Sequence, residues 1–191
     1  MTLTQRVQEL EHSVDQDALD ALADQLQGTL AELKSKLPEG VVAALHGDSL
    51  GHPLHPALVH LPLGGWMVAG LLDFWPGGDP GERAGRERAA DLALLFGTLG
   101  AVPTVAAGWT DWSNVRRGPA RREGLLHGLL AETAFTLCAA SLLARKGGRR
   151  GLGKALSGAG LGAALAAGAL GGNLVYRYGL GVGRTLSTPQ G

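Results

Sequence analysis

The sequence predicts an all-α fold: a four-helix transmembrane bundle in up-down-up-down order, preceded by an N-terminal helical arm. Its mean hydropathy of +0.09 averages two regimes, a polar and acidic stretch over residues 1–50 and apolar runs from about Pro56 onward. Arg-rich patches separate the apolar runs, which is the pattern of a multi-span membrane protein. Glycine contributes 31 of the 191 residues, about twice the usual share of ~7%. Much of it lies inside the apolar runs, where small residues let helices pack closely.

Composition excludes several classes of function. The 17 basic and 17 acidic residues balance, so there is no reason to expect a nucleic-acid partner. Cys138 is the single cysteine, which rules out an internal disulfide, and we expect a small buried side chain there. We find no phosphate loop, nucleophile elbow or other hydrolase or transferase motif, which leaves a redox subunit as the enzyme class open to this chain.

We divide the chain into a polar helical arm over residues 1–50, a membrane domain of four spans over 51–185 and a tail over 186–191. Each span is an apolar run of about 20 residues, which at 1.5 Å per residue covers the ~30 Å hydrocarbon core. Pro62 falls inside the first span, where it should free the Leu58 carbonyl and bend the first turns. The predicted spans are Pro56 to about Trp75, Asp91 to Trp112, Gly124 to Arg145, and Lys154 to about Tyr176.

The arm is predicted to contain two helices. A capping box at Thr2 and Gln5 opens the first helix, and a new N-cap at Asp15 to Asp17 starts the second. Leucines from Leu19 to Leu37 form its apolar stripe, and Pro38 stops it. We expect the stripe to pack on itself or on a second copy, since a membrane-surface anchor would need more Lys and Arg. His12 and His46 are expected on the surface.

Four alternating spans place the starts of the first and third, and the ends of the second and fourth, on one side of the membrane. These four ends hold the unusual polar and aromatic residues, whereas the other ends offer mainly Asp73 and Arg-rich loops. The aromatic members have an alternative role as an interfacial belt, and Asp111 could be solvated or paired with a nearby arginine. The residues of this layer are His52, His55, His60, Trp109, Asp111, Trp112, His127, Glu132, Asn173 and Tyr176.

Three kinds of site suit this layer. His60 and His127 each lie about one turn inside an apolar helix, where two imidazoles could hold haem b. A non-haem metal needs three or four converging ligands. With no cofactor, the same residues could serve a proton relay through Glu132, or satisfy backbone groups in a membrane scaffold. The candidate non-haem ligands are His52, His55, His60, His127 and Glu132.

Four sequence features together resemble one bacterial membrane family, domain of unknown function 2231. They are the run from His52 to Gly64, the segment Gly108-Trp-Thr-Asp-Trp112, His127, and the segment Gly171-Gly-Asn-Leu-Val-Tyr176. The resemblance covers roughly residues 50 to 185. It implies a four-helix membrane protein, and because some members carry Rieske-type iron-sulfur domains, it implies redox or haem chemistry.

Location and partners follow from these expectations. We expect a multi-pass protein of the inner membrane, with the lipid bilayer, a redox protein and a second copy of the chain as partners. Basic residues are evenly divided between the two sides, so they set no orientation. The first 35 residues are acidic and lack the apolar core of a signal peptide, which favours a cytoplasmic N-terminus.

Overall fold

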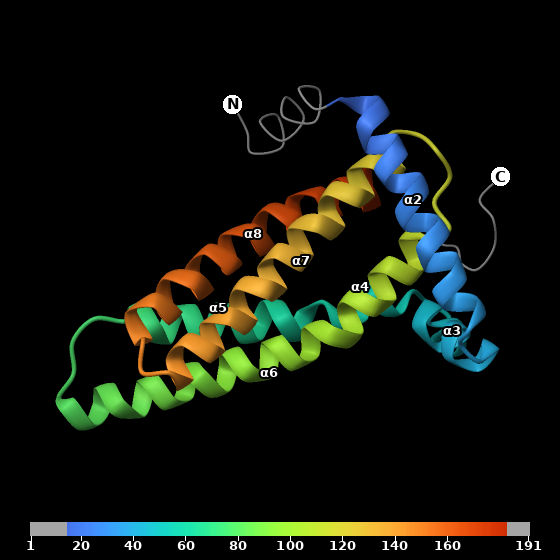
Figure 1. The fold of residues 1–191 in the computed structure, drawn as a ribbon. Coiled ribbons are helices and arrows are strands. Elements are labelled where there is room, and N and C mark those ends of the chain that lie inside the picture. Colours follow the sequence, from blue (N-terminus) through green and yellow to red (C-terminus); the bar gives the residue numbers. More distant parts are fainter. Residues whose placement is uncertain (1–14, 183–191) are drawn as a thin grey trace. The chain divides into compact units, whose positions relative to one another are not determined.

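The computed structural model describes residues 15–182, and over this range the chain is all-helical, with no strand (Figure 1). The predicted all-α class is therefore confirmed. The predicted helix after Thr2 lies outside the described residues. The elements are α2 (Gln16–Ser35), α3 (Glu39–His46), the 3-10 helix η1 (Asp48–Leu50), α4 (Leu54–Leu58), α5 (His60–Phe74), α6 (Pro80–Trp112), α7 (Pro119–Lys146) and α8 (Arg150–Tyr176).

The described chain folds into two compact units. Unit 1 comprises the residues up to Ala57 together with 105–129 and those from Ala166 onward. Unit 2 comprises 58–104 and 130–165. The long helices α6, α7 and α8 each contribute one part to each unit, and the two units are described separately below.

Four helical segments are long and apolar enough to cross a membrane, which confirms the four predicted spans. The segments are Leu54–Phe74, Pro80–Trp112, Pro119–Lys146 and Arg150–Tyr176. The last three begin earlier than predicted, because polar residues continue each helix beyond its apolar run. At the start of α6 a capping box is responsible: the Glu82 amide donates to Asp79 Oδ1 at 2.9 Å, and the Asp79 amide donates to Glu82 Oε2 at 3.0 Å.

The first span is broken near its start, as Pro62 predicts. Helix α4 ends at Leu58 and α5 begins at His60. Val59 between them keeps helical dihedrals, φ −56° and ψ −24°. Because Pro62 has no N–H to donate to the Leu58 carbonyl, the helical hydrogen-bond ladder is interrupted there.

Unit 2 is a four-helix arrangement built on small residues. Its core includes Trp66, Leu94, Ala134, Cys138 and Ala164, so the expected burial of Cys138 is confirmed. Trp66 is 6% exposed, and its indole N–H donates to Thr98 Oγ1 at 3.2 Å. Its polar edge is satisfied inside the protein.

Helices α5 and α6 approach closely at two glycines of unit 2, Gly65 and Gly97. A Cβ built on Gly65 would lie 2.6 Å from the Gly97 Cα and 2.7 Å from the Ala93 carbonyl oxygen. Both neighbours are backbone atoms, so they cannot move aside as a flexible side chain would. The neighbouring Gly64 is exposed, and a Cβ there would meet nothing within 4 Å.

Unit 1 is organised around the docking of α2. Asp15 caps this helix by accepting from the Asp17 amide at 3.0 Å, as predicted. The apolar face then packs Leu19 and Ala23 against Trp112 and Leu125. The end of α6 and the start of α7 therefore supply partners for this part of the stripe. Leu22, Leu33 and Leu37 are exposed, and the packing of the stripe on a second copy stays a prediction.

A buried ion pair accompanies this docking. Arg121, 3% exposed, donates from Nη2 to Asp20 Oδ1 at 2.8 Å, and Arg122 donates from Nη1 to Asp20 Oδ2 at 3.0 Å. The hydrogen bond from Arg121, followed by the contact with Arg122, holds the pKa of the Asp20 carboxyl below its usual value. Asp20 therefore ties α2 to the start of α7.

We expect Gly65→Ala to lower the free energy of unfolding in detergent by about 1–3 kcal/mol, because the new methyl group meets backbone on α6. Gly64→Ala is the matched control, and it should be neutral or stabilising by up to about 1 kcal/mol, since alanine favours the helix. Thermal unfolding of both variants measures the difference. Equal stability of the two variants would contradict the close approach.

We expect Asp20→Asn to destabilise the docked α2 at neutral pH, measured by limited proteolysis within α2. Because the folded pKa of Asp20 is depressed, its stabilisation is present above the unfolded value of about 3.8. The stabilisation is lost as the pH falls through the folded pKa. The wild-type protein should therefore become more susceptible to an acid-tolerant protease as the pH drops below about 4, whereas the variant should change less. If the proteolysis rates of wild type and variant depended on pH in the same way, the result would argue against this ion pair.

Candidate functional site

Two of the predicted histidines, His55 and His127, meet in unit 1. Their ring centroids lie 5.9 Å apart with the planes at 87°, an edge-to-face arrangement. The Nδ1 atom of His127 lies 2.7 Å from the Ala167 carbonyl oxygen on α8. A carbonyl only accepts, so Nδ1 carries the proton, and in the neutral imidazole the lone pair is on Nε2.

Two glycines make room for these imidazoles. A Cβ on Gly108 of α6 would lie 2.8 Å from His55 Nδ1, and a Cβ on Gly171 of α8 would lie 3.2 Å from His127 Cε1. Both glycines belong to segments singled out in the sequence, the one around Trp109 and the one around Asn173. Glycine on α6 therefore leaves space for the His55 ring from α4, and glycine on α8 leaves space for the His127 ring from α7.

The aromatic residues of the predicted layer divide into packed and exposed ones. Trp112 is 6% exposed and donates from its indole to the Arg121 carbonyl at 2.8 Å. Trp109 lies edge-to-face against Trp112 at 5.2 Å. These two tryptophans belong to the apolar core of unit 1, so the alternative role in an interfacial belt does not hold for the buried Trp112. Tyr176, in contrast, is 92% exposed.

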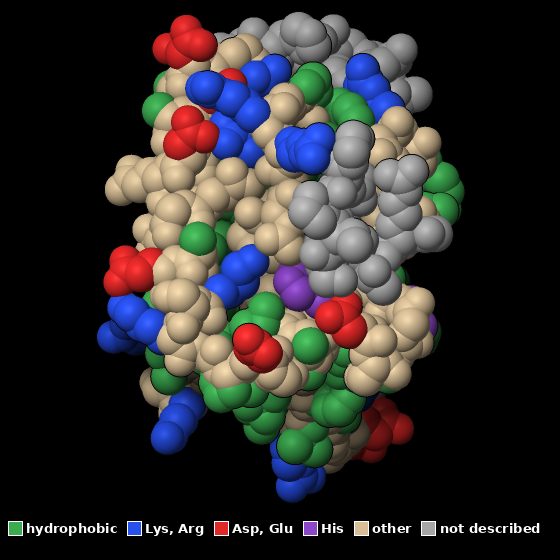
Figure 2. Space-filling model, turned by 90° about the vertical axis from the view of Figure 1, so that its right-hand side faces the viewer, with side chains coloured by type: hydrophobic (Ala, Val, Ile, Leu, Met, Phe, Trp, Pro, Cys, Tyr) green, Lys and Arg blue, Asp and Glu red, His purple; other side chains and the backbone are tan. Residues whose placement is uncertain are grey.

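The remaining predicted residues are more scattered. In unit 1, His52 is exposed, with Nδ1 3.2 Å from the Pro53 carbonyl, and Asn173 is partly buried. In unit 2, His60 is the exposed first residue of α5, and Glu132 is partly buried near the middle of α7. Figure 2 shows histidine side chains at the surface together with acidic and basic ones.

No group of three or more His, Cys, Asp or Glu side chains within residues 15–182 is arranged to hold a metal ion. The pairing of His60 with His127 joins residues of different units and stays a prediction. The division of the chain at residue 50 also stays a prediction.

His46 is a buried residue that the sequence analysis placed on the surface. It is 5% exposed, and its Nδ1 lies 2.8 Å from Oδ1 of Asp111, which is 7% exposed. The expectation for His46 is wrong because residues 39–46 form α3, a short helix that carries His46 onto the end of α6. For Asp111 the partner is this histidine, whereas the nearby Arg121 pairs with Asp20 and Asp24.

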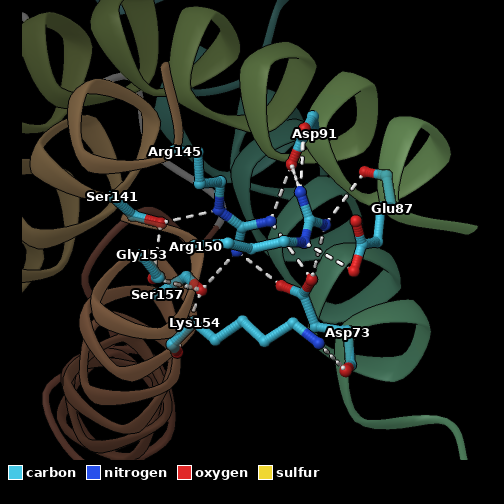
Figure 3. Close-up of polar contacts among 9 residues, drawn as sticks. All are labelled: Asp73, Glu87, Asp91, Ser141, Arg145, Arg150, Gly153, Lys154 and Ser157. Atoms are coloured by element: carbon cyan, nitrogen blue, oxygen red, sulfur yellow. Dashed lines mark hydrogen bonds and ion pairs between the residues drawn. The ribbon is translucent and has the colours of Figure 1, made fainter. Parts of the chain in front are cut away.

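A second polar cluster lies in unit 2, where the ends of α5 and α7 meet the starts of α6 and α8 (Figure 3). Asp73 and Arg145 are its centre, with side chains 0% and 4% exposed. Arg145 bridges Asp73 to Asp91, donating from Nη1 to Asp91 Oδ1 at 2.8 Å. Its Nε also donates to Ser141 Oγ at 3.0 Å. Helix ends that alternate in this way confirm the up-down-up-down order.

Helix α8 completes this charged cluster. Arg150 donates to Asp73 Oδ1 at 3.2 Å and to Asp91 Oδ1 at 3.1 Å, and it pairs with Glu87 at 3.2 Å. Lys154 donates to the Asp73 backbone carbonyl at 2.7 Å. The sequence analysis described these helix ends only as Asp73 and Arg-rich loops. The pattern missed the cluster because its members come from four different helices.

Comparison with known proteins gives one match. A family model described as "Predicted membrane protein (DUF2231)" matches residues 51–184. No curated protein and no solved structure matches the chain significantly.

We expect Arg145→Ala to destabilise the protein by about 3–5 kcal/mol, because it leaves the buried Asp73 carboxylate without its main partner. Arg149→Ala, an exposed change at the same helix connection, is the control and should have little effect. Chemical unfolding in detergent measures both. A small effect of Arg145→Ala would mean that water replaces the guanidinium at Asp73.

Proposed function

Because the chain belongs to the DUF2231 family of predicted membrane proteins, we propose that it binds haem b through His127 and His60 and transfers electrons to a partner protein. The observation that carries this proposal is the hydrogen bond from His127 Nδ1 to the Ala167 carbonyl, at 2.7 Å. Histidines that ligate metals commonly donate their other ring N–H to a carbonyl or carboxylate, which fixes the tautomer and the ring orientation.

Two further features of unit 1 fit an imidazole ligand. The proton on Nδ1 of His127 leaves the Nε2 lone pair to bind iron in the neutral ring. The ring also lies against Gly171, where a larger side chain would displace it. His127 is thus held by α8 in one orientation, while α7 positions its backbone. Such preorganisation is what an imidazole that would hold a metal requires.

The residues of this chain would bind, orient and shield the group. His127 would hold the iron from α7, and His60 would supply the second imidazole from the start of α5. The small side chains of α8 would leave space for a flat ring. When bound, haem supplies one-electron oxidation and reduction, and its axial ligands and burial set the potential.

A second candidate, a non-haem metal, is favoured by the 5.9 Å separation of the His55 and His127 rings. Two imidazoles at this separation are close enough to share one ion of the kind that imidazole suits, such as zinc or copper. The remaining ligands of the metal ion would have to be water or one of the other candidates, His52, His60 or Glu132. A proton relay or a scaffold without a cofactor is the third reading.

Several expectations stay predictions alongside this proposal. They are the inner-membrane location, a cytoplasmic N-terminus, a redox partner protein and a homo-oligomer. The bilayer itself is the environment that the four spans imply.

The first test is an absorption spectrum of detergent-purified protein from haem- and iron-supplemented cells, oxidised and then reduced with dithionite, with elemental analysis of the same sample. We expect a Soret band that shifts on reduction and is lost in His127→Ala and in His60→Ala, because each change removes an axial imidazole. Stoichiometric metal without a Soret band would instead support the non-haem site. Neither signal would overturn both cofactor proposals.

A matched pair of glycine variants tests whether His127 must keep its orientation. Gly171→Leu should lower the bound haem or metal, since even its Cβ would lie 3.2 Å from His127 Cε1. Gly172→Leu should retain the cofactor, because a Cβ there meets nothing within 4 Å. Equal cofactor content in the two variants would mean that cofactor binding does not depend on the packing of His127 against Gly171.

A further inference from the structure

Four polar residues of unit 1 form a chain of hydrogen bonds between α2, α3 and the end of α6. Lys34 Nζ lies 3.0 Å from Asn114 Oδ1 and 2.6 Å from Ser113 Oγ. Asn114 Nδ2 lies 3.3 Å from His46 Nε2. His46 Nδ1 lies 2.8 Å from Asp111 Oδ1. The chain has a charged group at each end, Lys34 and Asp111.

The donors and acceptors of this chain fix one another. The Lys34 ammonium can only donate, so the oxygen of the Asn114 amide must face it. The amide nitrogen then faces His46 and donates to Nε2, which must accept. Nδ1 of His46 therefore carries the ring proton and donates it to Asp111. This arrangement requires a neutral imidazole at His46.

A proton added at Nε2 of His46 is incompatible with this order. The new N–H would point at the Asn114 NH₂ group, donor against donor. Rotation of the exposed Asn114 amide relieves the conflict by presenting Oδ1 to His46. The rotated amide, however, turns its NH₂ group toward the Lys34 ammonium.

Protonation thus has opposite effects on the two ends of the chain. The contact of His46 with Asp111 becomes an ion pair and strengthens. Lys34 loses Asn114 as an acceptor and keeps Ser113, whose hydroxyl donates to the Thr110 carbonyl at 2.7 Å. Burial already lowers the pKa of Lys34, with Asp111 opposing that effect, so the ammonium depends on its acceptors at this position.

We propose that His46 is a pH-sensitive switch, in which protonation transfers Asn114 from Lys34 to His46 and loosens the C-terminal end of α2 from the α6–α7 connection. This inference is independent of the haem proposal, because it uses none of the proposed ligands. It makes the attachment of α2 weaker in acid and stronger at alkaline pH.

Hydrogen exchange of the full chain in detergent tests the switch. The Lys36 and Leu37 amides, which donate to the carbonyls of Leu33 and Lys34, report on the end of α2. After correction for intrinsic rates, we expect these amides to exchange about ten- to a hundredfold faster at pH about 5 than at about 8, as for loss of one charged hydrogen bond. Residues 143–147 at the end of α7 serve as the internal control and should not change.

Two variants make the result specific. His46→Gln cannot take up the proton, so the pH effect on these amides should disappear. Asn114→Asp gives a carboxylate that accepts from Lys34 and from protonated His46 together, and it should also remove the effect. A wild-type protein without the pH effect, or persistence of that effect in either variant, overturns the proposal. Asn114→Asp keeps the test decisive if His46→Gln fails to fold.

Discussion

The ion pair between Arg145 and Asp73 is the interaction on which the described membrane helices of unit 2 most depend. Neither side chain is accessible to water, so each charge needs the other to remain in an apolar environment. The pair joins the end of α7 to the end of α5, and Asp91 and Arg150 extend it to α6 and α8. Apolar contacts alone would allow the four helices to shift along their axes relative to one another. The charged cluster fixes their relative axial positions.

Much of the fold followed from the sequence, because hydrophobic length and helix caps are local signals. The four spans, the N-cap at Asp15 and the interruption caused by Pro62 each depend on residues a few positions apart. The long-range contacts did not follow in the same way. The packing of α2 against Trp112, the contact of His46 with Asp111 and the pairing of Arg145 with Asp73 each join residues more than 50 positions apart in the chain. Periodicity carries no information about such pairs.

The sequence predicted which residues belong to the candidate site better than it predicted how they are arranged in space. The glycine segments and the histidine-rich run did identify the elements that bring His55 and His127 together. The sequence could not show that His127 donates to the Ala167 carbonyl. Every residue of α8 has a backbone carbonyl, so residue identity does not indicate which one accepts the hydrogen bond. It also placed His46 on the surface, because the partner Asp111 lies 65 positions further along the chain.

Helix α6 has 33 residues and is therefore about 50 Å long, against a hydrocarbon core of about 30 Å. Even at the steepest usual tilt of about 40° its span across the bilayer exceeds that thickness. The excess falls at its N-terminal end, where Glu82, Arg83 and Arg86 cluster. The first turns of α6 therefore stand in water as a rigid, charged rod, fixed at its base by Asp91 and capped at its tip by Asp79.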